Sequence, residues 1–179
     1  LFSAEELVSA SGTSIPADGL IEIVTLDESG NGTVKTDLPM GSYYVKELAT
    51  DEHYILSDTK YPVTFEYAGQ ENAKVQLAVN DGEAIENHLI YGSVSGKKVD
   101  ENGEPLGGAL IGLFKYNDTE FTKENALMTV TSKEDGSFSF EQIPFGIWYV
   151  REIEQPTGFV LNETVYEVNI AENEQVVEI

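Results

Sequence analysis

Apolar and polar residues alternate in short runs along the chain, as is typical of half-buried β-strands. The runs cover residues 20–25, 43–48, 63–67, 75–79, 137–140, 148–153 and 166–170. Turn-forming Gly, Asn and Asp stand between them, at 27–32, 80–82, 100–103 and 134–136. Strands so short and evenly spaced predict an all-β protein built of packed sandwiches. Residues 3–6, Ser-Ala-Glu-Glu, have the spacing of a helix capping box, and residues 119–125 contain no Gly or Pro. Both segments are predicted to form short helical insertions.

One segment of the chain occurs twice. Residues 37–47, DLPMGSYYVKE, return as residues 142–152, QIPFGIWYVRE, so that Glu152 stands 105 positions after Glu47. This spacing is too long for a solenoid repeat and suits two tandem domains of ordinary small size. We place the boundary near residues 89–91, which predicts domains 1–89 and 90–179.

In each repeat, a carboxylate stands at the end of an otherwise apolar strand face. With a period of two, Trp148, Val150 and Glu152 share one face, and the first repeat has Tyr, Val and Glu47 at the same steps. An ionised carboxylate in an apolar core costs several kcal/mol unless it is paired or neutral. One interpretation is that the face has reached the rim and both Glu are solvated. Recurrence at the same step in two diverged copies favours a functional role.

Composition narrows the classes of function. The 179 residues, 41% of them hydrophobic, suffice for two modest cores. A net charge of −22 disfavours nucleic acid partners and direct membrane contact, because the surface repels phosphates and anionic headgroups. The absence of Cys excludes disulfides, thiolate nucleophiles and thioesters. No nucleophile-base pair and no metal-ligand pattern is visible, so we expect neither a cofactor, nor a metal, nor enzymatic turnover.

Two motifs carry a resemblance to a known family. The segment 98–114 reads Lys-Val-Asp, then an acidic Gly turn, then Pro-Leu-Gly-Gly-Ala and Leu-Phe. The segment 143–152 reads Ile-Pro-Phe-Gly-Ile-Trp-Tyr-Val-Arg-Glu and is followed by Gly158-Phe159, with its copy at 38–47 followed by His53-Tyr54. In this the chain resembles the CnaB or SpaA-type domains of Gram-positive surface adhesins and pilins. The resemblance covers essentially the whole chain as two modules.

The resemblance implies two tandem prealbumin-like Greek-key β-sandwiches. Such domains form an isopeptide bond between a first-strand Lys and a last-strand Asn or Asp, promoted by a buried Glu. Lys98 then matches the amine and Lys97 its out-facing neighbour, Asn87 matches the acceptor of the first module, and Glu47 and Glu152 match the promoting acids. The chemistry needs a dry core, because lysine attacks only as a neutral amine and the acid moves protons as ammonia leaves.

Each module is expected to be incomplete. The first lacks a counterpart of the opening strand that carries Lys98, and the second ends before a counterpart of Asn87. Asn169 and Asn173 are the remaining candidate acceptors late in the second copy.

The resemblance implies a stalk or pilus-shaft module of an extracellular, cell-wall-anchored protein, with neighbouring modules of the same protein as partners. Self-cross-linking would be a single event for each module rather than turnover. An alternative is a binding module that contacts a host extracellular matrix protein or glycan through sandwich loops. A third hypothesis is that the chain is an accessory domain of transthyretin-like fold attached to an enzyme.

Overall fold

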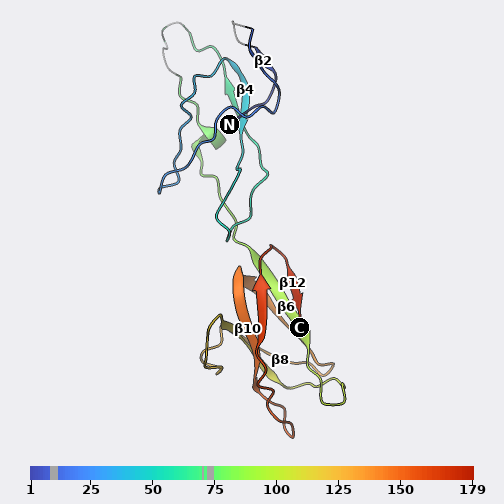
Figure 1. Cartoon of the computed structure of the whole chain (residues 1–179). Coiled ribbons are helices and arrows are strands. Elements are labelled where there is room, and N and C mark those ends of the chain that lie inside the picture. The colour runs from blue at the N-terminus through green and yellow to red at the C-terminus, as the bar shows by residue number, and fades with distance from the viewer. Residues whose placement is uncertain (9–11, 70, 72–74) are drawn as a thin grey trace. The chain divides into compact units, whose positions relative to one another are not determined.

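The computed structural model describes residues 1–8, 12–69, 71 and 75–179. Its regular secondary structure is almost entirely short β-strands, joined by irregular segments (Figure 1). Its contacts divide the chain into two compact units. Unit 1 comprises Leu1–Asp51 and Leu56–Asn87, and unit 2 comprises Glu52–Ile55 and His88–Ile179. The prediction of an all-β protein is therefore confirmed.

Unit 2 is a sandwich of two sheets. Its strands are β6 (Tyr91–Lys97), β7 (Leu110–Lys115), β8 (Met128–Thr131), β9 (Ser137–Pro144), β10 (Gly146–Glu154), β11 (Tyr166–Ile170) and β12 (Val176–Glu178). One sheet has the order β11-β10-β7-β8 and the other β12-β6-β9. Strand β12 runs parallel to β6, with Val177 level with Val94, whereas β9 is antiparallel to β6.

The core of unit 2 lies between these sheets. Alternate residues of the strands point inward, which is why the sequence shows a period of two. The buried cluster consists of Val94, Ala109, Ile111, Leu113, Phe138, Phe140, Ile143, Val150, Val168 and Ile170. Trp148 packs against this cluster, on the inner side that strand alternation predicts for it.

Unit 1 repeats one of the two sheets. Its strands are β1 (Phe2–Ser3), β2 (Leu7–Val8), β3 (Ser14–Ile15), β4 (Gly41–Val45) and β5 (Tyr61–Phe65), and the 3-10 turn η1 covers Val79–Gly82. The sheet β1-β4-β5 corresponds to β7-β10-β11, because Phe2 lies opposite Tyr44 as Phe114 lies opposite Tyr149. Its small core is built on Leu1, Leu7 and Tyr43.

The second sheet of unit 2 has no regular counterpart among the described residues of unit 1. In unit 2 the central strand β6 binds β9 on one side and β12 on the other. A segment in the position of β9 or β12 therefore has no ladder partner unless a strand like β6 lies beside it. Residues 32–39, which stand 105 positions before β9, are accordingly irregular.

Two strand predictions were wrong. In the segment 20–25 only Leu20 forms a bridge, to Phe2, while the N–H of Ile21 binds the carbonyl of Leu1. The segment 75–79 forms no strand with the described residues, and Val79 begins η1. The other five predicted strands lie within or overlap β4, β5, β9, β10 and β11.

The two helical insertions were predicted wrongly, although they are a minor part of the fold. Ser3 belongs to strand β1, where its Oγ donates a hydrogen bond to the carbonyl of Pro16 rather than capping a helix. The segment 119–125 contains a single turn, in which the N–H of Ala126 binds the carbonyl of Thr122. In the described part of the chain, no helix has the length and apolar character needed to cross a membrane.

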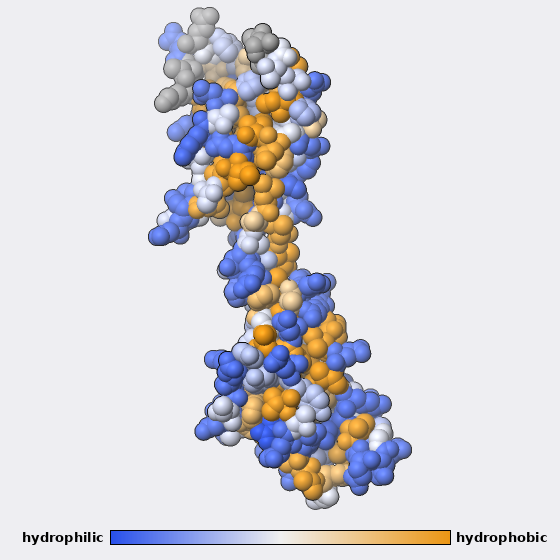
Figure 2. Space-filling view, viewed as in Figure 1, coloured by the Kyte–Doolittle hydropathy of each residue, from blue (hydrophilic) through white to orange (hydrophobic). Residues whose placement is uncertain are grey.

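Apolar residues also lie at the surface of both units, among many hydrophilic ones (Figure 2). The most exposed large apolar side chain is that of Val160, in unit 2, at 90%.

Candidate functional site

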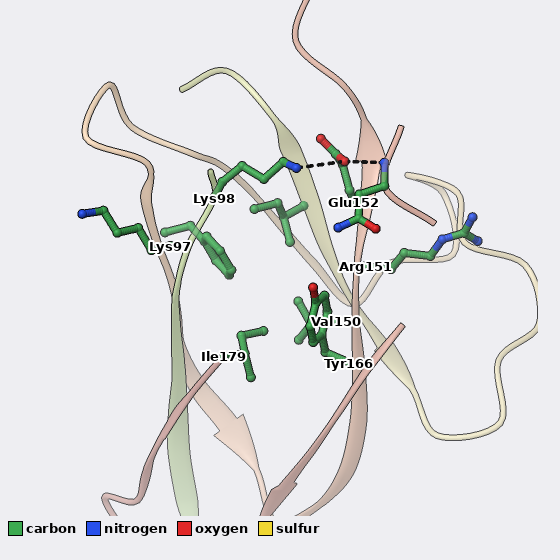
Figure 3. A pocket seen from close by; sticks show the side chains of 10 residues that line it. Lys97, Lys98, Val150, Arg151, Glu152, Tyr166 and Ile179 are labelled. Carbon is green, nitrogen blue, oxygen red and sulfur yellow. Dashed lines mark hydrogen bonds and ion pairs between the residues drawn. The ribbon is translucent and has the colours of Figure 1, made fainter. Parts of the chain in front are cut away.

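The site in unit 2 begins with Lys98, the residue that follows β6. Its backbone is held on both sides, because its N–H donates to the carbonyl of Gly136 at 2.8 Å and its carbonyl accepts from the N–H of Leu106 at 3.0 Å. Its side chain is only 17% exposed. The neighbouring Lys97 is exposed and points away from Glu152, as alternation predicts (Figure 3).

Glu152 lies on the facing sheet, in strand β10, at the end of the face that carries Trp148 and Val150. Its side chain is 4% exposed, so the interpretation of a solvated carboxylate at the rim is wrong for this repeat. Oε2 of Glu152 lies 3.5 Å from Nζ of Lys98 and accepts the backbone N–H of Asn162 at 2.7 Å (Figure 3). The residues of the two sheets thus bring an amine and a carboxylate together inside the sandwich.

A small cavity surrounds this pair. It measures about 70 Å³ and is lined by Lys98, Glu152 and Asn162 and by apolar side chains that include Ile111, Phe138 and Ile179. Among the described residues, no hydrogen-bond donor reaches Oε1 of Glu152, although this oxygen is buried. A buried carboxylate oxygen without a donor costs free energy, so the site has the capacity to bind one more polar group.

The site in unit 1 has the same acid but a different companion. Oε2 of Glu47 accepts the N–H of Ser57 at 3.1 Å, and Oε1 accepts Nδ2 of Asn87 at 2.9 Å. Nδ2 of Asn87 also donates to Oγ1 of Thr50 at 2.8 Å. Glu47 is half-buried and Asn87 is exposed, so this pair is more open to water than Lys98 and Glu152. The structure therefore brings together the two residues predicted as promoter and acceptor of the first module.

The backbone donors Ser57 and Asn162 were missed by the sequence analysis. Each lies ten positions after its glutamate and donates its N–H to Oε2. They also stand 105 positions apart, as Glu47 and Glu152 do, so the repeat spacing was the signal that could have found them. The shared hydrogen bond fixes both carboxylates in the same way relative to their strands.

Asn169 and Asn173 are not in the site. Oδ1 of Asn173 accepts the N–H of Tyr91, at the opposite end of β6 from Lys98. At about 3.3 Å per residue, that end lies about 23 Å away from Lys98. Asn169 is exposed on β11, where it pairs with Ile147. Neither residue can serve as the acceptor for Lys98.

Two acidic turns flank the strand end that carries Lys98. Oδ1 of Asp100 accepts the N–H groups of Glu104 and Asn102, at 2.9 and 2.8 Å, and these hydrogen bonds lower the pKa of Asp100. The hydroxyl and N–H of Ser137 likewise lower the pKa of Asp135. Both carboxylates stay ionised and keep the turns closed at neutral pH. In the described part of the chain no cluster of His, Asp and Glu is suited to hold a metal ion.

Together the fold and the site define a prealbumin-like β-sandwich with a lysine and a glutamate facing each other across its core. A family model for the SpaA prealbumin-like fold domain matches residues 6–82 and 92–179. The chain belongs to this family, and the resemblance inferred from the motifs around Lys98 and Glu152 is confirmed. No curated protein matches the chain.

Several solved structures are similar. The Bacillus anthracis TIE protein is 22% identical with a TM-score of 0.62, covering 87% of this chain and 27% of its own. The Bacillus cereus major pilin subunit BcpA is 21% identical with a TM-score of 0.45, covering 75% and 39%. A streptococcal ancillary pilin is 24% identical with a TM-score of 0.41, covering 80% and 42%. The chain thus spans about a quarter of the length of the TIE protein, and the likeness shows a shared fold.

Proposed function

We propose that the chain forms two modules of a stalk or pilus shaft on a Gram-positive cell surface, and that side-chain isopeptide bonds lock each module. The observation that carries the proposal is the pair of Lys98 and Glu152, 3.5 Å apart and largely shielded from water. Family membership and the tandem arrangement of the two matches support it. The proposed place of work is outside the cell, on a wall-anchored protein, with neighbouring modules as partners.

The position of Lys98 suits a mechanical role. It follows β6, and β12, the last strand of the module, runs parallel to β6. A covalent bond between the end of β6 and the end of β12 would carry a pulling force directly from the first strand to the last. The strands between them would then bear no load, and the hydrogen bonds of the sheets would not have to resist it.

The register of β12 predicts where the acceptor stands. Glu178 lies level with Ser95, and Lys98 is three residues after Ser95. The residue level with Lys98 is therefore three after Glu178, which is two after Ile179. In the first repeat Asn87 likewise stands two residues after Ile85. An Asn at the corresponding position would place its carboxamide beside Nζ of Lys98 and Oε1 of Glu152.

The proposed reaction is an amide exchange. The neutral amine of Lys98 attacks the side-chain carbonyl carbon of the Asn, a new C–N bond forms, and the C–N bond to the leaving ammonia breaks. Glu152 in its acid form donates a hydrogen bond to that carbonyl and then passes protons from the amine to the leaving group. No oxidant or cofactor is consumed. Fixed proximity supplies much of the rate, since effective molarities reach about 10⁵ M or more.

The site in unit 1 supports the same proposal, because it holds the acid and the acceptor rather than the acid and the amine. Glu47 and Asn87 already share a hydrogen bond of 2.9 Å, so the acid and the acceptor are in contact before any lysine is present. The missing partner would be a lysine on a strand in the position that β6 occupies in unit 2. Such a strand would also supply a ladder partner for the irregular segment 32–39, which stands where β9 does in unit 2.

The test is intact mass spectrometry of the chain extended after Ile179 by a copy of Glu86-Asn87-His88-Leu89. This extension puts an Asn two residues after Ile179. We expect the mass to fall short of the sequence mass by one ammonia, and Glu152→Ala, Lys98→Arg and Ala at the added Asn each to abolish the loss. Lys97→Arg is the matched control and should leave it intact. A full sequence mass in the folded, extended protein would overturn the proposed cross-link.

A further inference from the structure

A short loop of the first repeat is part of unit 2. The segment Glu52–Ile55 clusters with His88–Ile179 rather than with the rest of its own repeat. The N–H of Ile55 donates to the carbonyl of His88, and the N–H of Ile90 donates to the carbonyl of His53, both at 2.8 Å. Tyr54 and Leu89 form the antiparallel bridge between these two hydrogen bonds.

This pairing extends into the sandwich of unit 2. The N–H of Phe145 donates to the carbonyl of Ile90 at 3.1 Å, and the Phe145 ring meets the ring of His53 edge to face at 5.0 Å. The loop of the first repeat thus pairs with the entry segment His88–Ile90 through one β-bridge and its two flanking hydrogen bonds. The pairing buries part of Ile55, which is half-buried, next to an entry segment that carries no carboxylate.

The second repeat contains the same loop. Residues 53–57 read His-Tyr-Ile-Leu-Ser and residues 158–162 read Gly-Phe-Val-Leu-Asn, 105 positions later. Each loop ends at the residue whose N–H binds the glutamate of its own repeat. Both loops are therefore anchored alike, with Val160 in the position of Ile55.

The second loop differs, because no described residue forms a β-bridge with it. Val160 is 90% exposed, and among the described residues its N–H has no backbone acceptor. Phe159 is 38% exposed, the same value as its counterpart Tyr54. Residues 157–162 carry no charge, in a chain whose net charge is −22. An uncharged apolar edge on an acidic protein is a place where another acidic module can approach without charge repulsion.

We propose that Gly158–Val160 is the docking edge for the entry segment of a further module of the same family, an extended apolar tripeptide of the His88-Leu89-Ile90 kind. The inference rests on the proposed stalk function, because its partner is the next module of the same protein. The N–H of Val160 donates to the first carbonyl of that tripeptide, and the carbonyl of Gly158 accepts the N–H of its third residue. Since Gly158 has no ring, the edge relies on these hydrogen bonds and on burial of Val160 rather than on a contact like that of His53 with Phe145.

The proposed pairing depends on the covalent connection between modules. A tripeptide edge with two hydrogen bonds binds weakly between separate molecules, whereas a tethered partner is present at an effective concentration in the millimolar range. The test therefore uses the full chain followed directly by a second copy of residues 86–179. In this three-module protein the copied Asn87 also stands two residues after Ile179, so one sample tests both proposals.

The measurement is amide hydrogen exchange at Val160 and Ile55. In the chain of 179 residues we expect fast exchange at Val160 and slow exchange at Ile55. In the three-module protein the exchange at Val160 should slow by at least about tenfold, toward the rate at Ile55. Val160→Pro, which removes the N–H, should speed exchange at the copied Ile90 amide. Val165→Pro is the control, because Val165 is also exposed but lies outside the edge.

Equal, fast exchange at Val160 in both proteins would overturn the docking edge. Slow exchange at Val160 that appears in the 179-residue chain at high concentration would also overturn it, in favour of a second copy of the chain as the occupant. The intact mass of the same three-module sample reports the cross-link separately, because ammonia is lost whether or not Val160 becomes protected. Failure of one proposal is therefore distinguishable from failure of the other.

Discussion

Nζ of Lys98 lies 3.5 Å from Oε2 of Glu152, and the two side chains are only 17% and 4% exposed. The two residues are far apart in sequence: Lys98 directly follows β6 of one sheet, and Glu152 lies in β10 of the other. Removing both from water costs free energy, which their mutual attraction and the N–H of Asn162 offset. The pair is therefore sensitive to loss of one partner.

Replacing Lys98 by Met should destabilise unit 2 by about 3 kcal/mol, because Glu152 would be left buried without its cation. Urea unfolding followed by fluorescence measures this, since Trp148 is the only tryptophan of the chain and reports on unit 2. The double variant Lys98→Met with Glu152→Gln should recover much of the loss. Lys97→Met, which removes an exposed amine, should cost less than about 0.5 kcal/mol. Equal costs for the two lysines would contradict the prediction.

Ser132 ties the segment that follows the Lys98 turn to strand β8. Its buried Oγ donates to the carbonyl of Leu106 at 2.8 Å and accepts the N–H of Ala109 at 3.0 Å. Ser132→Ala should lower the free energy of unfolding by about 1–3 kcal/mol, because both backbone groups lose their partner. Ser139→Ala, at an exposed position of β9, is the matched control in the same urea titration. A neutral Ser132→Ala would mean that water replaces the hydroxyl.

Gly96 makes room for an aromatic ring beside Lys98. A Cβ at this position would lie 2.3 Å from the ring of Phe138, its partner in the register of β6 and β9, and 2.9 Å from the carbonyl oxygen of Ile179. Gly96→Ala should therefore cost about 1–3 kcal/mol through overpacking. Adding Phe138→Leu should relieve part of the clash, which a double-mutant cycle on urea unfolding would detect. Additive effects of the two changes would show that the ring is not the obstacle.

The turn after Lys98 should make stability depend on pH. The pKa of Asp100 is lowered chiefly by the N–H of Glu104 and then by that of Asn102. A carboxylate with a lowered pKa in the folded state stabilises above its unfolded pKa, near 3.8, and this contribution disappears as the pH falls through the lower folded value. Asp100→Asn should thus remove part of the loss of stability seen below about pH 4. Equal slopes for Asp100→Asn and the parent would contradict the prediction.

Strand alternation was sufficient to predict several local features. The period of two predicted that the side chains of Trp148, Val150 and Glu152 share one face of the strand. The structure shows that this face is the inner one. The repeat spacing of 105 residues placed Glu47 and Glu152 in equivalent positions, and both accept an N–H ten residues later. These features depend on neighbours within a strand and its turn, so the local order of residues determines them.

Only the tertiary structure decided how buried each glutamate is. Glu152 is enclosed because β6 brings Lys98 across from the other sheet, whereas Glu47 meets Asn87 in a more open place without such a strand. The apolar runs 20–25 and 75–79 are irregular because, apart from the bridge of Leu20 to Phe2, they find no ladder partner among the described residues. A strand exists only when a partner accepts its hydrogen bonds, and burial only when something covers the site. Both conditions depend on residues far away in the sequence. Neither strand alternation nor composition tells which distant residues become neighbours.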